Sequence, residues 1–205
     1  MKGFLPEELI SKLIELTDII SQDAQKTSFN HELAGEIKDE WEIDVPLLTN
    51  VGFQPFLFKL IKEYIRFIRI QSRPKDTHLE CSDEAFIRND RFFEENNWRI
   101  NSAWFNNQKD NEYNPSHNHG GILSGVLYLK IPEYLPARKN DYQDGSICFI
   151  GNTSSSDDQF TSSTFSILPK VGDIFLFPAT LRHLVYPFRT ANDKEIRRSM
   201  SFNIS

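Results

Sequence analysis

Three histidines of this chain have the spacing of a metal site. His117 and His119 stand one residue apart in "NPSHNHGG", and His183 lies in "GDIFLFPATLRHLVYPF". Residues two apart in an extended segment project from the same face, so both imidazoles of the first pair could contact one cation. With His183 on a neighbouring strand, three neutral imidazoles could hold a divalent transition metal and leave positions open for other ligands. The alternative is that each imidazole is only a hydrogen-bonded structural group.

The C-terminal segment "EIRRSMSFNIS" adds a candidate anion site. Alternation in a strand places Arg197 and Ser199 on one face and Arg198 on the other. A buried guanidinium beside a hydroxyl predicts a carboxylate pocket, because arginine binds carboxylates through two parallel hydrogen bonds. A register slip of one residue would give this role to Arg198. A solvent-facing polar edge strand is the alternative interpretation.

The elements that must position these residues follow from hydrophobic periodicity. Helical spacing of apolar residues occurs at residues 9–20, 31–43 and 53–71, so the N-terminal third is expected to be helical. Strands are expected at 98–106, 122–131, 145–150, 164–168, 173–178, 182–187 and 197–204, where β-branched and aromatic runs alternate with turn residues. Helices packed on antiparallel strands, in a double-sheet roll or sandwich, are the expected architecture.

Composition limits the functional classes. With 205 residues, one domain with a sizeable core is expected, and a net charge of −6 disfavours nucleic-acid binding over a broad surface. The N-terminal segment carries acidic residues within its apolar run, and no long apolar run occurs elsewhere, so we expect a cytoplasmic protein that does not enter membranes. Cys81 and Cys148 are too few for a disulfide framework. His31 and His78 lie among polar residues and are expected at the surface.

At this point the residues resemble the iron(II)- and 2-oxoglutarate-dependent oxygenases. The segments "YNPSHNHGGILSGVLYLKIP" and "GDIFLFPATLRHLVYPFRTANDKEIRRSMSFN" are similar to an H-x-H branch of that superfamily, found in marine bacteria and phages. The motifs N-x-x-H-x-H, S-G-x-x-Y, F-P-x-x-x-x-H and R-x-S-x-x-F-N occur in the order of the branch. The resemblance implies an α+β, mainly β fold: a double-stranded β-helix (jelly roll) with supporting N-terminal helices. One oxygenase domain would span residues 1–205, with helical support at 1–97 and the core at 98–205.

The resemblance also assigns roles. His117, His119 and His183 would bind Fe(II), and Arg197 with Ser199 would hold the distal carboxylate of the co-substrate 2-oxoglutarate. Tyr128 matches an aromatic position that bonds the same carboxylate in several relatives. His119 stands where the superfamily usually has a carboxylate, which leaves the metal site one charge unit more positive. Ligation by His119, a carboxylate from elsewhere such as Asp144, or only two protein ligands are the alternatives.

The expected function is therefore that of a dioxygenase, a hydroxylase that uses O2 and releases succinate and CO2. A peptide or small-molecule substrate is expected, with a prolyl side chain as the first candidate by analogy of fold. An exposed edge strand would also support a homodimer. Two rivals are a three-histidine metalloenzyme without 2-oxoglutarate, such as a thiol dioxygenase or a zinc hydrolase, and a non-catalytic β-sandwich binding module. The first rival gives Arg197 and Ser199 no shared task, and in the second the imidazoles are incidental polar residues.

Overall fold

The computed structural model describes residues 1–29, 35, 37–71, 98–136, 143–151, 163–192 and 194–205. His31, His78 and Cys81 lie outside these residues. The elements are β1 (Lys2–Phe4), α1 (Glu7–Gln22), β2 (Glu40–Glu42), α2 (Val45–Asn50), α3 (Phe53–Gln71), β3 (Ile100–Gln108), β4 (Asn114–His117), β5 (Leu123–Lys130), β6 (Ile147–Ile150), β7 (Thr164–Ile167), β8 (Asp173–Pro178), β9 (Arg182–Val185) and β10 (Arg197–Ile204).

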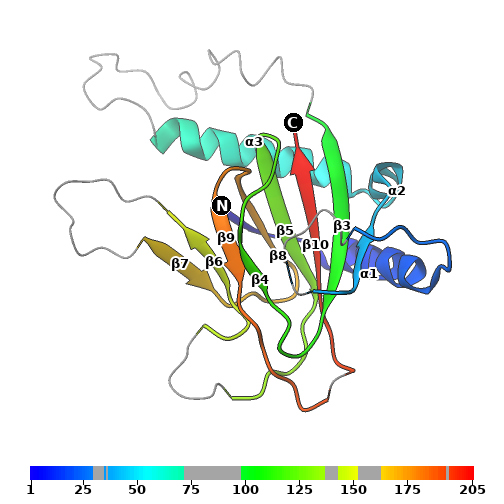
Figure 1. Cartoon of the computed structure of the whole chain (residues 1–205). Helices are drawn as coiled ribbons and strands as arrows, with labels where there is room; N and C mark the ends of the chain where they lie inside the picture. The colour runs from blue at the N-terminus through cyan, green and yellow to red at the C-terminus, as the bar shows by residue number, and fades with distance from the viewer. Residues whose placement is uncertain (30–34, 36, 72–97, 137–142, 152–162, 193) are drawn as a thin grey trace, which may run out of the picture.

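The strands form two facing antiparallel sheets. One sheet has the order β1-β8-β5-β10-β3-β2, and the other has the order β4-β9-β6-β7. Helices α1 and α3 cover the outer face of the six-stranded sheet, while the four-stranded sheet lies against its other face (Figure 1). The expected α+β, mainly β jelly roll is confirmed, since non-consecutive strands are neighbours in both sheets. The space between the sheets is where the candidate site lies.

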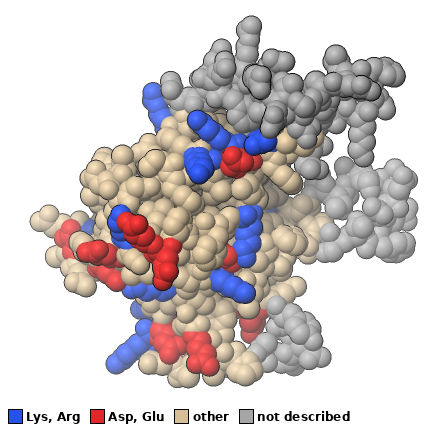
Figure 2. Space-filling view, turned by 180° about the vertical axis from the view of Figure 1, so that it is seen from behind, with Lys and Arg blue, Asp and Glu red and all other residues tan. Residues whose placement is uncertain are grey.

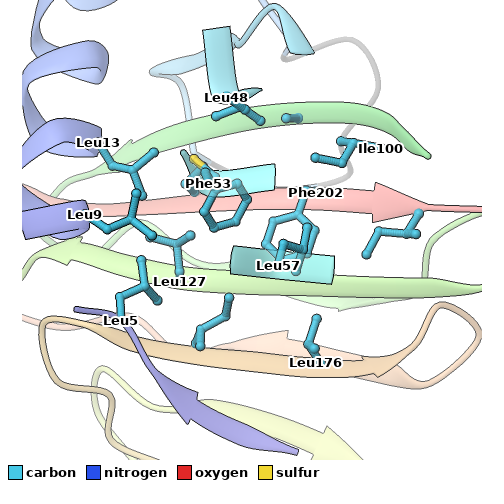
Figure 3. Packing of buried hydrophobic residues seen from close by; sticks show 14 of the residues in the cluster. Leu5, Leu9, Leu13, Leu48, Phe53, Leu57, Ile100, Leu127, Leu176 and Phe202 are labelled. Atoms are coloured by element: carbon cyan, nitrogen blue, oxygen red, sulfur yellow. The ribbon is translucent and has the colours of Figure 1, made fainter. Parts of the chain in front are cut away.

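The larger hydrophobic core lies between the helices and the six-stranded sheet. Leu9 and Leu13 of α1 and Phe53 and Leu57 of α3 point onto the strands, with Leu57 near Phe202 (Figure 3). The helices form because apolar residues recur along one stripe of each, and Glu7 and Glu8 favour the start of α1 through the helix dipole. A smaller cluster between the two sheets is mostly aromatic and includes Tyr128, Phe175 and Phe177.

One expected helix was wrong. Within the described part of residues 31–43, the chain is extended and ends in the edge strand β2, whose Trp41 lies opposite Phe105 of β3. Pairing with β3 overrides the helical periodicity of this segment, as tertiary contacts commonly do. The short strands β1 and β4 were also missed. All seven strands that the sequence predicted are present: β8 and β10 have the predicted ends, and the other five have shifted ends.

Strand β10 fastens the helical layer to the sheet through Arg198. The guanidinium donates to Asn107 Oδ1 at 2.7 Å, to Thr17 Oγ1 at 3.0 Å and to Asp18 Oδ1 at 2.6 Å. Lys130 Nζ lies 2.6 Å from the same Asp18 oxygen. Partial burial tends to raise the pKa of Asp18, but hydrogen bonds from Lys130 and Arg198 outweigh this effect and lower the pKa below its ordinary value. Arg198 is therefore a structural residue that faces α1.

The S-G and F-N motifs are two sides of one contact between β5 and β10. Ser124 Oγ donates to Asn203 Oδ1 at 2.7 Å, and Gly125 lies opposite Phe202. A β-carbon on Gly125 would come within 2.3 Å of the Phe202 ring, which is fully buried and cannot move aside. Glycine is required here because the ring occupies the space of a side chain.

The face of the molecule opposite to that of Figure 1 has no large area of one charge. Lys and Arg side chains are interspersed with Asp and Glu on this face (Figure 2). Among the described helices, none is both long and apolar enough to cross a bilayer.

Gly125→Ala should destabilise the fold, because the new methyl group overlaps the Phe202 ring. We expect the free energy of unfolding to drop by about 1–3 kcal/mol, the usual cost of overpacking a core. Urea denaturation followed by circular dichroism measures this. Gly120→Ala is the matched control, since nothing lies within 4 Å of a β-carbon at that position. Equal stability of the two variants would contradict this account of the motif.

Candidate active site

Antiparallel register brings the three histidines together. His117 at the end of β4 lies directly opposite His183 of β9, and their ring centroids are 4.2 Å apart. His119 follows just beyond β4, where its N–H donates to Ala179 O at 2.9 Å. Potential ligand atoms of the three residues all lie within 4.8 Å of one another. Asn118, between the first two, is exposed and points away, as the alternation predicted.

Backbone carbonyls fix the orientation of two of the rings. His117 Nδ1 lies 2.7 Å from Pro115 O, and His183 Nδ1 lies 3.1 Å from Leu181 O. A carbonyl only accepts, so each Nδ1 carries the proton and each Nε2 carries the free lone pair. This second interaction is the usual way in which proteins orient metal-binding imidazoles. The ring of His119 packs instead on Trp104, at 5.6 Å between centroids.

The separation of the Nε2 atoms suits a shared ion. His119 Nε2 lies 3.3 Å from His183 Nε2. Two nitrogens that each lie about 2.1 Å from one metal are about 3.0–3.4 Å apart at bond angles of about 90–110°. A hydrogen bond between the two rings would engage only these two nitrogens, whereas a cation accommodates all three imidazoles. The donor set therefore fits a divalent transition metal.

Burial keeps these imidazoles neutral, which is the form that binds metals. Desolvation lowers the pKa of His183 to about 3 and that of His119 to about 4. It also lowers the pKa of His117, although the hydrogen bond to Pro115 opposes this effect. At neutral pH the three lone pairs are consequently available without loss of a proton.

Arg197 lies next to the pocket that is lined by the three histidines, Gln108, Tyr128 and Ser199, among others. It does not line this pocket itself, but its guanidinium contacts Gln108 and lies near the Tyr128 ring, and both of these residues do. Its side chain is 1% exposed, and its guanidinium donates to the Gly145 carbonyl and to Gln108 Oε1. The guanidinium carbon lies 5.7 Å from the centre of the Tyr128 ring and 5.0 Å from that of Phe188. Arg197 thus faces the interior between the sheets, opposite to Arg198.

The charge of Arg197 has no counter-ion within the described chain. No carboxylate of the described residues forms an ion pair with it, and its buried Nε has no hydrogen-bond partner. Burial of an unpaired charge is costly, and neutral acceptors compensate only in part. A carboxylate that enters the pocket would supply both the missing charge and the missing acceptor. The residues therefore fit an anionic ligand that extends between Arg197 and the histidines.

The sequence identified five residues of this pocket as site candidates, the three histidines, Tyr128 and Ser199, and missed others. Among the described residues, the group that could hold a metal contains three histidines and no carboxylate. Asp144 lies instead beside Gly145, whose carbonyl accepts from Arg197. Gln108 was missed, although alternation in "INSAWFNNQ" places it on the same face as Trp104 and Asn106. Burial raises the pKa of Tyr128 to about 12, despite the nearby Arg197, so its phenol remains a hydrogen-bond donor.

Comparison with known proteins gives similarity in family and in fold. Residues 102–203 match a family model described as "Putative 2OG-Fe(II) oxygenase". No curated protein sequence matches the chain. The structure is similar to a prolyl-4-hydroxylase from Pseudomonas putida, with 11% sequence identity, a TM-score of 0.52, and coverage of 98% of this chain and 90% of that chain.

Two further solved structures are similar over the whole chain. One is an oxidoreductase of the 2OG-Fe(II) oxygenase family from Burkholderia pseudomallei, with 12% identity, a TM-score of 0.51, and coverage of 100% of this chain and 84% of that chain. The other is HygX from Streptomyces hygroscopicus with nickel, 2-oxoglutarate and hygromycin B bound, with 11% identity, a TM-score of 0.50, and coverage of 100% and 81%. At these identities the likeness is one of fold.

Metal binding should depend on His183. We expect His183→Ala to weaken Co(II) or Ni(II) binding by at least about 10–100-fold, since loss of a ligand costs more than loss of an outer-shell partner. Titration followed by visible absorption or calorimetry measures the affinity. Leu184→Ala, on the same strand, is the control for local packing damage. An unchanged affinity in His183→Ala would show that the imidazoles do not share an ion.

Proposed function

We propose an activity for this chain from one premise: the chain belongs to the 2OG-Fe(II) oxygenase family, whose model matches residues 102–203. The proposed activity is hydroxylation of a C–H bond, with 2-oxoglutarate and O2 as co-substrates and succinate and CO2 as co-products. A prolyl or other peptide side chain is the substrate that we would test first. The support for this choice of substrate is the fold that the chain shares with a prolyl-4-hydroxylase.

One observation carries the proposal. A cluster of three neutral imidazoles lines the pocket, and a fully buried arginine that has no carboxylate partner among the described residues lies behind Gln108, which lines the same pocket. 2-Oxoglutarate has a keto-acid end that chelates a metal and a distal carboxylate that needs a cation. The imidazoles and the arginine match these two demands, and a ligand with a single anionic group would meet only one of them.

Each residue then has a defined task. His117, His119 and His183 would hold iron(II) through their Nε2 atoms. Arg197 and the Ser199 hydroxyl would bind the distal carboxylate, and the Tyr128 phenol would donate to the same group. Gln108 and the Gly145 carbonyl hold the guanidinium in place from its other sides. Because these groups are fixed before any ligand enters, little reorganisation is required on binding.

The bound group supplies the oxidative chemistry. Iron(II), 2-oxoglutarate and O2 together provide an oxidative decarboxylation in which one oxygen atom enters succinate and the other enters the product, with release of CO2. The residues of the chain position the reactants and keep water out of the pocket. Val126 and Ile147 line the pocket beside the polar groups and exclude water from its inner wall.

The rival functions leave parts of the pocket without a role. A three-histidine enzyme that does not use 2-oxoglutarate, such as a thiol dioxygenase or hydrolase, leaves the Arg197 charge uncompensated. A β-sandwich binding module leaves three Nε2 lone pairs directed at one another. We also propose that residues 1–205 act as one oxygenase domain, because Arg198 of β10 joins the core to Thr17 and Asp18 of α1.

Purified protein with Fe(II) and ascorbate should convert 2-oxoglutarate to succinate, slowly alone and faster with an accepted peptide. Prolyl peptides and the same peptides with alanine for proline are the substrate and its control, with mass spectrometry to detect a gain of one oxygen atom. Succinate formation without any gain by the prolyl peptide would retain the oxygenase and reject the prolyl substrate. No succinate from protein with confirmed bound metal would reject 2-oxoglutarate use.

Two substitutions should test the Arg197 assignment from opposite directions. Arg197→Lys removes the two-point contact, and Gln108→Glu supplies an internal carboxylate that competes with the ligand for Arg197. We expect each to raise the KM for 2-oxoglutarate by about 10–100-fold, which corresponds to loss of about one charged hydrogen bond. Arg182→Lys is the control, because Arg182 is exposed and bonds Ser116 outside the pocket. A change in kcat alone would contradict a role in co-substrate binding.

A further inference from the structure

Unsatisfied polar atoms of the described chain gather around the candidate pocket. The buried side-chain atoms without a hydrogen-bond partner are Arg197 Nε, Glu40 Oε1, Asn106 Oδ1 and Asn114 Oδ1. A ligand carboxylate would satisfy Arg197. Asn114 Oδ1 packs against Gly35, where a β-carbon would come within 2.6 Å. Glu40 and Asn106 remain, and a pair of unsatisfied buried acceptors needs an explanation.

The backbone places these two acceptors next to each other. Glu40 of β2 lies opposite Asn106 of β3. Asn107 N donates to Asp39 O and Ile43 N donates to Ala103 O, both at 2.8 Å. Because hydrogen-bonded and non-hydrogen-bonded pairs alternate along an antiparallel ladder, Glu40 and Asn106 form a non-hydrogen-bonded pair. In an antiparallel ladder, the side chains of a non-hydrogen-bonded pair are the closer ones, with β-carbons about 4.5–5.5 Å apart. The carboxyl and the amide are therefore within reach of each other.

Asn106 connects this pair to the pocket. Its side chain lines the pocket together with the three histidines and Gln108. Its Oδ1 is buried without a partner, whereas its Nδ2 is not among the buried unsatisfied atoms and forms no hydrogen bond with the described residues. The nitrogen is thus the end of the amide that reaches the open pocket, and the oxygen is the end turned toward the protein.

A proton on Glu40 resolves the conflict. Burial, followed by repulsion from Glu112 and Asp39, raises the pKa of Glu40 to about 7. These two acids are the charged groups of the described chain that act on Glu40, and no basic side chain pairs with it. The protonated carboxyl can donate to Asn106 Oδ1, which leaves the amide N–H groups directed at the pocket. The ionised carboxylate would instead attract those N–H groups and turn the amide oxygen toward the ligand.

We propose that Glu40 is a positioning residue whose proton holds the Asn106 amide with its N–H donors facing the pocket, so that the dicarboxylate co-substrate binds together with a proton at Glu40. This inference rests on the proposed binding of 2-oxoglutarate. Glu40 acts through Asn106 and does not contact the ligand. An anion that enters the pocket favours the protonated state of Glu40, since it repels the carboxylate and accepts from the amide nitrogen.

The test measures binding rather than turnover. Protein saturated with Mn(II) is titrated calorimetrically with N-oxalylglycine, an unreactive dicarboxylate analogue of 2-oxoglutarate. The titration is repeated between about pH 5.5 and 8.5, where both carboxylates of this ligand stay ionised. Pairs of buffers with different ionisation enthalpies report the protons taken up. For the native protein we expect proton uptake, and above the pKa of Glu40 an affinity that falls toward tenfold per pH unit.

Substitutions at Glu40 separate the proton from the side chain. Glu40→Gln keeps an N–H that donates to Asn106 Oδ1 at every pH, so its affinity should match that of the native protein at low pH and lose both the slope and the proton uptake. Glu40→Leu has no donor and should bind about tenfold more weakly or worse at low pH. Glu42→Gln is the matched control, with the same charge change at an exposed position of β2.

The outcomes distinguish this inference from the function on which it rests. Tight binding with no proton uptake, or a pH slope that persists in Glu40→Gln, would overturn the role of Glu40 and leave the proposed function intact. No binding of N-oxalylglycine at any pH would overturn both. If Glu40→Leu fails to fold, Glu40→Gln still decides between these results.

Folding stability offers an independent measure of the same proton. Because the pKa of Glu40 in the folded protein, about 7, lies above its ordinary value of 4.5, the folded chain retains a proton that the unfolded chain releases. The contribution of Glu40 to stability is therefore complete below about pH 4.5 and is lost as pH rises through 7. The buried histidines oppose this decline in every variant, because their lowered pKa values make stability rise with pH. Urea denaturation should therefore show that the stability of the native protein relative to Glu40→Gln falls as pH rises from about 4.5 to 7, and Glu42→Gln should follow the native protein. A difference between the native protein and Glu40→Gln that does not change with pH would contradict the assignment.

Discussion

The alternation of side chains along β10 gives two adjacent arginines opposite surroundings. Arg198 points to the helical layer, where Asp18 neutralises it and neutral oxygens take its other donors. Arg197 points between the sheets, where its partners among the described residues are neutral acceptors and aromatic rings. One charge is compensated within the fold, and the other is left for a ligand. A strand shifted by one residue would exchange these roles and bury the apolar face of β10 on the wrong side, so the hydrophobic core and the anion site specify the same register.

The metal end of the pocket depends on sheet geometry in the same way. The pairing of β4 with β9 sets His117 opposite His183, and the backbone carbonyls two residues before each histidine fix their ring tautomers. His119 lies beyond the strand end, where its N–H bond to Ala179 and its contact with Trp104 hold it. Donors carried by paired strands are placed more accurately than donors on long loops, which suits a site with three neutral ligands.

Period-two patterning explains what the sequence could predict. It located seven of the ten described strands, the shared face of Arg197 and Ser199, and the common direction of His117 and His119. It did not locate β2, because Ile37, Trp41 and the surrounding acids have helical spacing and only the pairing with β3 makes the segment extended. Glu40 was therefore not identified from the sequence as a candidate residue. Gln108 lies on a predicted strand, but its role depends on contact with an arginine 89 positions away, which no local pattern encodes.

The substitution of an imidazole for the usual carboxylate bears on the charge of the whole pocket. A divalent ion held by three neutral histidines, together with Arg197, would place an excess of positive charge between the sheets, and the bound ion would favour the ionised form of Glu40. A dicarboxylate would remove most of that excess and with it the effect of the ion on Glu40. The acids Glu112 and Asp39 act in the same direction as the ligand, since they also oppose a negative charge at Glu40. Occupancy of the anion site and protonation of the β2 carboxyl are thus coupled through charge as well as through the Asn106 amide, so each bound state of the pocket has its own preferred protonation state.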